Sequence, residues 1–236
     1  MAILIGHASI DENGKISGGK KGDQTGREIC TRSWYSKKWN VYIEPKNEDI
    51  AEKAVSLMKA ICSDSSFGYS QTSRWTGYDA IMKNGGKVDG TVKGDFDCSS
   101  LVSAVYAMSG VNLENLRSLY TGNMKRAFEK TGLFMIYTDE AHLKSDKYAK
   151  KGGIFLNEGS HVVLALEDGS EAGKAPASST QTTGGTGKVN IELDVLKKGA
   201  KGSQVLTLQR LLRQMQYRDQ NGAQLELDGS FGAKTL

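Results

Sequence analysis

One cysteine, Cys98, stands where polar residues give way to an apolar run, in the segment "GDFDCSSLV" (residues 94–102). This pattern predicts the start of a buried helix, with Asp97 as the N-cap and Ser99 in the first turn. The first turn of a helix carries unpaired N–H groups and the positive end of the dipole, which lower a thiol pKa and can hold an oxyanion. Cys98 is therefore either a nucleophile that needs a base, because Asp97 opposes its ionisation, or a small buried hydrophobe.

Three histidines could supply that base. His161 begins the apolar segment "HVVLAL", and a histidine at a strand start facing a helix N-terminus is the arrangement that cysteine hydrolases use. His142 lies in the charged segment "DEAHLKSDKY", which we expect to be solvated. His7 lies in the first predicted strand, where it is either structural or a third member of the site. The candidate pair is thus Cys98 and His161.

The elements that must position this pair follow from periodicity and capping. "ILIGHASI" predicts a strand, and the Asn-Gly signal after it predicts a hairpin. "NEDIAEKAVSLMKAICSD" predicts an amphipathic helix capped by Asn47, and residues 98–109 predict a second, buried helix. "GGIFLNE" and "SHVVLALEDG" predict two paired strands. This order of helices and strands predicts an α+β domain.

Composition changes sharply at "GSEAGKAPASSTQTTGGTGKVN", residues 169–190, which is rich in Gly, Ser, Thr and Ala. We interpret it as a flexible linker between a large domain, residues 1–168, and a short α-helical module, residues 191–236. The formal net charge of +4 suits an anionic partner such as a bacterial wall. No dense Lys/Arg cluster is interleaved with aromatics, so we expect no nucleic-acid partner.

The remaining composition narrows the chemistry. No apolar run is long enough to cross a bilayer, and the N-terminus has no signal-peptide pattern, so we expect neither membrane insertion nor Sec-type export. The three cysteines are too sparse for a disulfide scaffold, and no Cys/His cluster has metal-ligand spacing. We therefore expect neither a metal nor another cofactor, and the oligomeric state is left open.

The segments "FDCSSLV" and "GGIFLNEGSHVVLALEDG" together resemble the cysteine-peptidase domain of the NlpC/P60 superfamily. "FGYS" (67–70) resembles the segment with the superfamily's active-site tyrosine, and the N-terminal pattern resembles phage endolysins and prophage wall hydrolases. The resemblance spans roughly residues 4–169. It implies a papain-like fold with a helix-borne nucleophile packed on a small antiparallel sheet. It also implies Cys98 as nucleophile, His161 as general base and then acid, and Tyr69 as a hydroxyl donor near the oxyanion.

The group that orients the histidine departs from the superfamily pattern. Its members usually take a third polar residue from the strand after the histidine strand, and here the predicted linker begins almost at once. Gln24 in "GDQTG" is our first candidate, because an amide oxygen can accept from an imidazole N–H. Asp23 and His7 are the alternatives, and a solvated glycine turn is the structural interpretation of this loop.

Other side chains near the predicted site could contact substrate, namely Gln71, Arg74 and Asp23. The three tryptophans, Trp34, Trp39 and Trp75, are expected to be core or hairpin-face aromatics rather than sugar platforms.

The C-terminal segment resembles the PG-binding-1 module, and the pattern stops before that module's last helix, so we expect a partial peptidoglycan-binding module. The matching residues are Val205, Leu208, Gln209, Leu212, Asp228, Gly229, Phe231, Gly232 and Thr235.

These resemblances imply a peptidoglycan hydrolase that cleaves a wall amide through a thioester. The enzyme would be an endopeptidase or an N-acetylmuramoyl-L-alanine amidase, and the sequence does not choose between them. Lack of an export signal implies a phage endolysin held in the host cytoplasm until lysis. The alternatives are a peptidoglycan-binding protein with little or no catalysis, and a transferase using the same cysteine chemistry.

Overall fold

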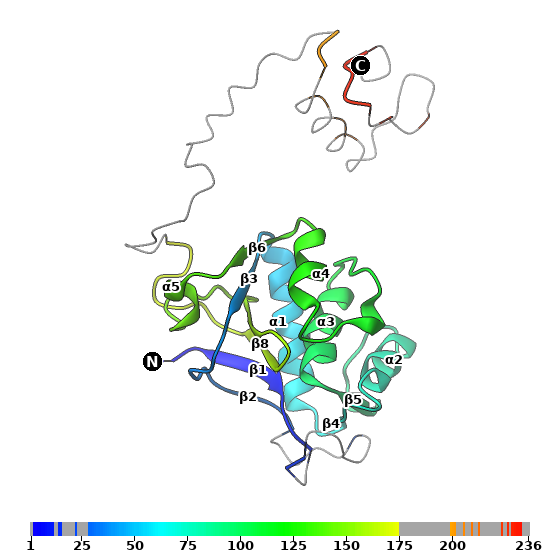
Figure 1. Ribbon diagram of the computed structural model, residues 1–236. Helices are drawn as coiled ribbons and strands as arrows, with labels where there is room; N and C mark the ends of the chain where they lie inside the picture. Colours follow the sequence, from blue (N-terminus) through cyan, green and yellow to red (C-terminus); the bar gives the residue numbers. More distant parts are fainter. Residues whose placement is uncertain are drawn as a thin grey trace. The chain divides into compact units, whose positions relative to one another are not determined.

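The computed structural model describes residues 2–11, 14–15, 22 and 28–174, together with 199–201, 205, 209, 212, 223, 226 and 228–232. Contacts divide the chain into two compact units, Met1–Ser179 and Thr180–Leu236, which are treated separately below. The first unit is mixed α+β, with helices against a small antiparallel sheet (Figure 1). This confirms the α+β class predicted from the sequence.

The sheet holds six strands in the order β2-β1-β8-β7-β3-β6, and every neighbouring pair is antiparallel. The predicted pairing of the last two strands with each other is confirmed. β1 pairs with β2, a strand that begins at Ile29, well beyond the Asn-Gly signal that predicted a hairpin directly after the first strand. The strand nearest the N-terminus lies beside the last strand, so both ends of the domain meet in the middle of the sheet. The strands are β1 (Leu4–Ala8), β2 (Ile29–Ser33), β3 (Val41–Pro45), β6 (Phe134–Tyr137), β7 (Ile154–Asn157) and β8 (His161–Ala165).

Alternation along the strands gives the sheet two different faces. On β8, Val162 and Leu164 join the large core beneath the helices, whereas Val163 and Ala165 join a smaller core on the opposite face. Trp39 is buried in the smaller core, as predicted for a core aromatic. We call these the helix face and the open face of the sheet.

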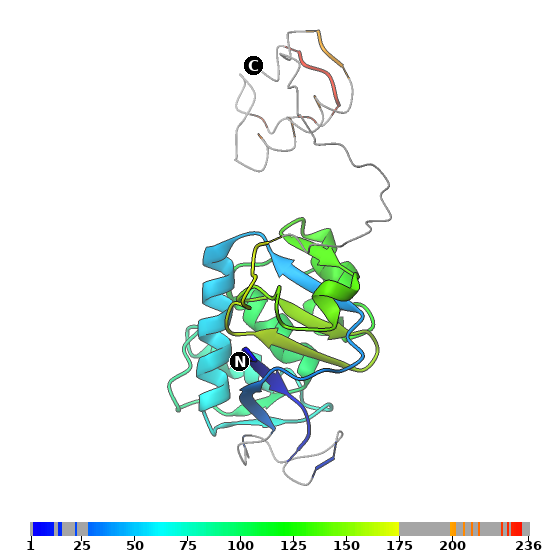
Figure 2. The ribbon, with the colours of Figure 1, turned by 90° about the vertical axis from the view of Figure 1, so that its left-hand side faces the viewer.

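Two helices cover the helix face (Figure 2). The helix α1 (Glu48–Ser63) begins as predicted, because Asn47 Oδ1 accepts from the Ile50 N–H at 2.9 Å. The helix α3 (Cys98–Met108) is the predicted buried helix, and its first nine residues are all buried. The sequence of α3 is apolar on all sides because the core surrounds this helix. A helix at the surface would instead carry a single apolar stripe.

The smaller elements lead the chain to the start of α3. A parallel pair, β4 (Phe67–Tyr69) and β5 (Gly94–Phe96), flanks the helix α2 (Thr76–Lys83). A Cβ on Gly94 would lie 2.4 Å from the backbone nitrogen of Gly77, so only glycine lets α2 pack on β5. The helices α4 (Met124–Lys130) and α5 (Glu140–Leu143) and the 3-10 turn η1 (Leu116–Ser118) complete the described elements.

The end of the first unit lies beyond residue 168. Gly169 N–H donates to Ala149 O at 2.8 Å, and Glu171 N–H donates to Lys147 O at 2.8 Å. The first residues of the predicted linker thus remain hydrogen-bonded to the domain. Its stretch from 175 to 190 lies outside the described residues.

In the second unit, Val205, Gln209 and Leu212 are helical, as predicted. The Gln209 side chain donates to Asp228 Oδ1 at 2.7 Å and accepts from the Gly229 N–H at 2.9 Å. The polar residues of the predicted module are therefore linked to one another. Leu208 and Thr235 lie outside the described residues.

Candidate active site

The start of α3 is held by a reciprocal cap. Asp97 Oδ1 accepts from the Ser100 N–H at 2.6 Å, and Ser100 Oγ accepts from the Asp97 N–H at 2.9 Å. This capping box satisfies two groups that the helix end would otherwise leave unpaired. Cys98 is the first residue of the helix, as predicted from "GDFDCSSLV".

Arg74 neutralises the capping carboxylate. Its Nη1 donates to Asp97 Oδ2 at 2.7 Å and to Ser99 Oγ at 2.9 Å. Its Nη2 donates to the backbone carbonyls of Leu119 and Arg117. Because these internal acceptors engage the guanidinium, Arg74 positions the helix start, and its expected contact with substrate stays a prediction. Ser99 joins the same network through its hydrogen bond to Asp97 Oδ1, at 2.9 Å.

The Cys98 thiol is buried against β8. The backbone N–H groups of Val162, the residue directly after His161, and of Ser99 and Cys98 lie near the sulfur and favour its ionised form. Burial raises the pKa of Cys98 to about 12, the Asp97 charge adds to this rise, and the three N–H groups oppose it. The lowered thiol pKa expected from the helix N-terminus is therefore wrong for this state, because desolvation outweighs the helix-end donors.

His161, the first residue of β8, is buried on the open face. Its ring stacks on Trp39, with centroids 6.2 Å apart, and meets the His7 ring edge to face at 5.8 Å. Burial lowers the pKa of His161 to about 3, and the charges of His7, Lys37 and Arg32 add to this. The imidazole is thus neutral near pH 7, which is the form that a general base requires.

His7 lies beside His161 because β1 is the neighbour of β8. The pairing of Ile5 with Ala165, continued by two residues, puts His7 opposite Val163 and diagonal to His161 on the same face. His7 Nε2 is 3.5 Å from Cys30 Sγ on β2, and its Nδ1 has no hydrogen-bond partner in the described part of the chain. Of the three proposed orienting residues, His7 contacts His161, whereas Gln24 and Asp23 lie outside the described residues.

Tyr69 ends β4 and is buried. Burial raises the pKa of Tyr69 to about 12, and the charge of Cys98 adds to the rise, so the phenol keeps its proton and lies within electrostatic range of the thiol. The exposed Gln71 donates from Nε2 to the Tyr69 hydroxyl at 3.4 Å. The two side chains therefore adjoin each other as expected, and contact of Gln71 with substrate stays a prediction.

His142 is buried rather than solvated, which corrects the interpretation of "DEAHLKSDKY". Its ring stacks on Tyr137, with centroids 4.0 Å apart, and Nδ1 lies 2.8 Å from Asp139 Oδ2. The charged neighbours point outward while the imidazole fills the open-face core beside Tyr42. These contacts give His142 a structural role.

Within the described residues, no group of three or more His, Cys, Asp or Glu side chains could hold a metal ion, and no helix is both long and apolar enough to span a membrane. The arrangement has the parts for acyl transfer, namely a thiol at a helix start, a neutral imidazole and a phenol donor. Sequence reasoning did not identify Cys30, Arg32 and Tyr35 as neighbours of this site. For Cys30 and Arg32, the signal that could have identified them is their spacing of two residues on β2, which puts both side chains on one face of the sheet.

Replacement of Arg74 by Ala should destabilise the first unit by about 2–4 kcal/mol, because it leaves a largely buried carboxylate unpaired. The matched control is Arg117→Ala. The side chains of Arg74 and Asp97 are 18% and 9% exposed, whereas those of Arg117 and its partner Asp79 are 57% and 51% exposed. We expect the control to cost less than about 1 kcal/mol. Chemical denaturation measures both, and equal losses would contradict the role of Arg74.

Stability of the first unit should fall as the pH drops from about 6.5 towards 4. Folding lowers the pKa of His7 to about 4 and of His161 to about 3, so in this window the unfolded chain binds more protons than the folded unit. Each histidine contributes a slope of up to about 1.4 kcal/mol per pH unit. Denaturation across this range should give a steeper slope for wild type than for His7→Gln/His161→Gln. Identical slopes would refute the burial effect.

Comparison with known proteins gives one informative match. A family model for the endolysin-like domain matches residues 5–172, the span that holds the sheet, α3 and every described residue of the candidate site. Comparisons with curated proteins and with solved structures find no match. The match supports a phage lytic enzyme that acts on the bacterial cell wall. Because it covers more than half of the chain, the chain belongs to the endolysin-like domain family.

Proposed function

We propose that the first unit is a cysteine peptidoglycan hydrolase of the NlpC/P60 type that cleaves an amide bond of the wall peptide. The observation that carries this proposal is the docking of the α3 start on β8, where the Cys98 sulfur meets the backbone directly after His161. A thiol at a helix N-terminus, with a neutral imidazole at the start of the strand on which that helix packs, supplies the nucleophile, the base and the oxyanion site that acyl transfer needs.

Each step can be assigned to described groups. The Cys98 sulfur attacks the amide carbonyl while its proton moves to a ring nitrogen of His161. The first-turn N–H groups of α3 and the Tyr69 hydroxyl stabilise the oxyanion. His161 then gives the proton to the leaving amine as the C–N bond breaks. Water, deprotonated by His161, releases the acid from the thioester and restores the thiol.

The pair starts as a neutral thiol and a neutral imidazole. Burial raises the pKa of Cys98 to about 12 and lowers the pKa of His161 to about 3, so transfer of a proton between them before substrate binds is unfavourable. Deprotonation of the thiol therefore accompanies the attack, as general-base catalysis, and does not precede it as a stored thiolate–imidazolium pair.

His7 orients His161 in this proposal. It lies diagonal to His161 on the adjacent strand and contacts its ring. The His7 ring is in turn contacted by Cys30, whose sulfur lies 3.5 Å from His7 Nε2. β1 thus takes the place of the strand that superfamily members supply after the histidine strand. Gln24 stays a prediction for a further member of the site.

The second unit is proposed to bind peptidoglycan, and we place the protein in the host cytoplasm before release at lysis. The hydrogen bonds from Gln209 to Asp228 and Gly229 support the predicted module, since these residues carry its pattern. The choice between endopeptidase and amidase is left to product analysis.

Replacement of Cys98 by Ala should abolish hydrolysis, because it removes the nucleophile. The measurements are the loss of turbidity of a suspension of purified Gram-positive walls and the release of free amines from them. Mass analysis identifies the products. Cys62→Ser, a thiol on α1, is the matched control and should keep substantial activity. Failure of wild type to release any product would favour the alternative of a wall-binding protein, and transfer of an acyl group to an added amine would favour a transferase.

Replacement of His7 by Gln should lower kcat by about 10- to 100-fold with little change in KM, because a misplaced base loses reactive geometry. The charge of His7 lowers the pKa of His161, so its removal should move the acid limb of the kcat/KM profile to higher pH. His142→Gln, in the same open-face core, is the control and should leave that limb in place. A His7→Gln profile that coincides with wild type would remove His7 from the site.

A further inference from the structure

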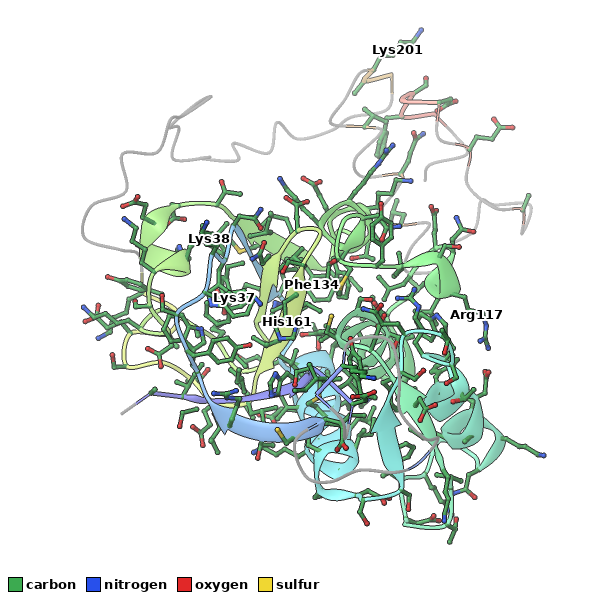
Figure 3. All side chains as sticks on the ribbon, turned by 60° about the horizontal axis from the view of Figure 1, so that its bottom comes forward. Lys37, Lys38, Arg117, Phe134, His161 and Lys201 are labelled. Atoms are coloured by element: carbon green, nitrogen blue, oxygen red, sulfur yellow. The ribbon has the colours of Figure 1, made fainter. Side chains whose placement is uncertain are left out.

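β2 and the loop that follows it place three cations beside the candidate active site. Arg32 lies on β2 two residues from Cys30, so the two share the open face with His7 and His161. Lys37 and Lys38 follow in the loop, and both are exposed. Figure 3 shows Lys37 next to His161, with Lys38 beyond it. We call Arg32, Lys37 and Lys38 the basic rim.

Arg32 is held in place by an aromatic ring, and none of the described carboxylates pairs with it. Its Cζ lies 4.7 Å above the Tyr35 ring, a cation–π contact that fixes the guanidinium plane. The Tyr35 ring lies 6.3 Å from the His7 ring and 5.7 Å from the Trp39 ring, on which His161 stacks. Two successive rings, Tyr35 and then His7 or Trp39, therefore connect the guanidinium to the imidazole of His161.

The residues of the basic rim differ from Arg74 and Arg117 in their ion pairing. Arg74 pairs with Asp97 and Arg117 pairs with Asp79, whereas no ion pair in the described part of the chain involves Arg32, Lys37 or Lys38. A guanidinium that is orientated but unpaired keeps its N–H fork free for a planar bidentate partner.

We propose that the basic rim binds a free carboxylate of the wall peptide close to the bond that is cut, with Arg32 as the principal contact. This inference rests on the proposed function and adds the substrate class, an anionic peptide. A carboxylate matches the fork geometry of arginine, and Lys37 adds a second positive charge on the side of His161.

Carboxylate binding would also strengthen the base. The charges of Arg32 and Lys37 contribute to the low pKa of His161, so an anion docked on them would offset that effect and favour the imidazolium formed during attack. The substrate that carries the carboxylate would thus be cut faster as well as bound more tightly.

The test compares walls before and after conversion of their carboxylates to amides, both stripped of teichoic acid, with amine release as the readout. Amidation should slow wild type by roughly three- to tenfold, the range of a well-oriented but exposed ion pair. Arg32→Gln should cut native walls at about the amidated rate and show little further effect of amidation. The matched control, Arg126→Gln, alters another unpaired, exposed arginine, on α4, and should behave as wild type.

The outcomes separate this inference from the proposed function. Cleavage of both walls with an amidation effect that persists in Arg32→Gln would overturn the inference and leave the hydrolase intact. Equal cleavage of the native and the amidated wall by wild type would overturn it too, because both walls are free of teichoic acid and differ only in their carboxylates. No cleavage of any wall by wild type would instead refute the proposed function. Unchanged thermal unfolding of Arg32→Gln confirms that the effect is on binding.

Discussion

The docking of the α3 start on β8 is the contact on which the rest of the candidate site depends. Three charged or polar side chains, Arg74, Asp97 and Ser99, hold this helix end, and the sulfur of Cys98 meets the backbone after His161. The buried carboxylate of Asp97 would be costly without Arg74. Helix capping and ion pairing therefore act together to place one sulfur atom, and the surrounding core prevents the helix from shifting along the sheet.

Burial restricts the positions of the side chains of this site and keeps the Cys98 thiol and the His161 imidazole uncharged. Close packing holds the rings of His7, His161 and Trp39 against one another. The exclusion of water that accompanies burial raises the pKa of Cys98 and lowers that of His161. A neutral pair resists adventitious chemistry at the thiol, because the thiolate is the reactive species. In the proposed mechanism, charge would develop only when a substrate carbonyl lies close enough to accept the sulfur, so reactivity would depend on occupancy of the site.

Local patterns in the sequence predicted individual helices and strands. The contacts between distant residues and the burial of the thiol depend on long-range strand pairing, which these patterns do not encode. The Asn47 cap and the Asp97 helix start follow from residues within one turn, so both were predictable. The contact of His7 with His161 arises from residues 154 positions apart and depends on β1 pairing with β8, which no local signal encodes. Likewise, the lowered thiol pKa was predicted from groups at the helix start, and burial reversed its direction.

The position of β1 links activity to the integrity of the whole domain. β1 lies between β2 and β8, so His7, Cys30 and His161 come together when the first and last strands of the unit pair. Such a non-local pairing closes a loop of more than 150 residues and carries a large entropic cost, which the packing of both sheet faces must offset. A partly folded domain with α1 and α3 formed would hold the thiol without its base. The proposed pair of Cys98 and His161 would therefore form only in the complete fold.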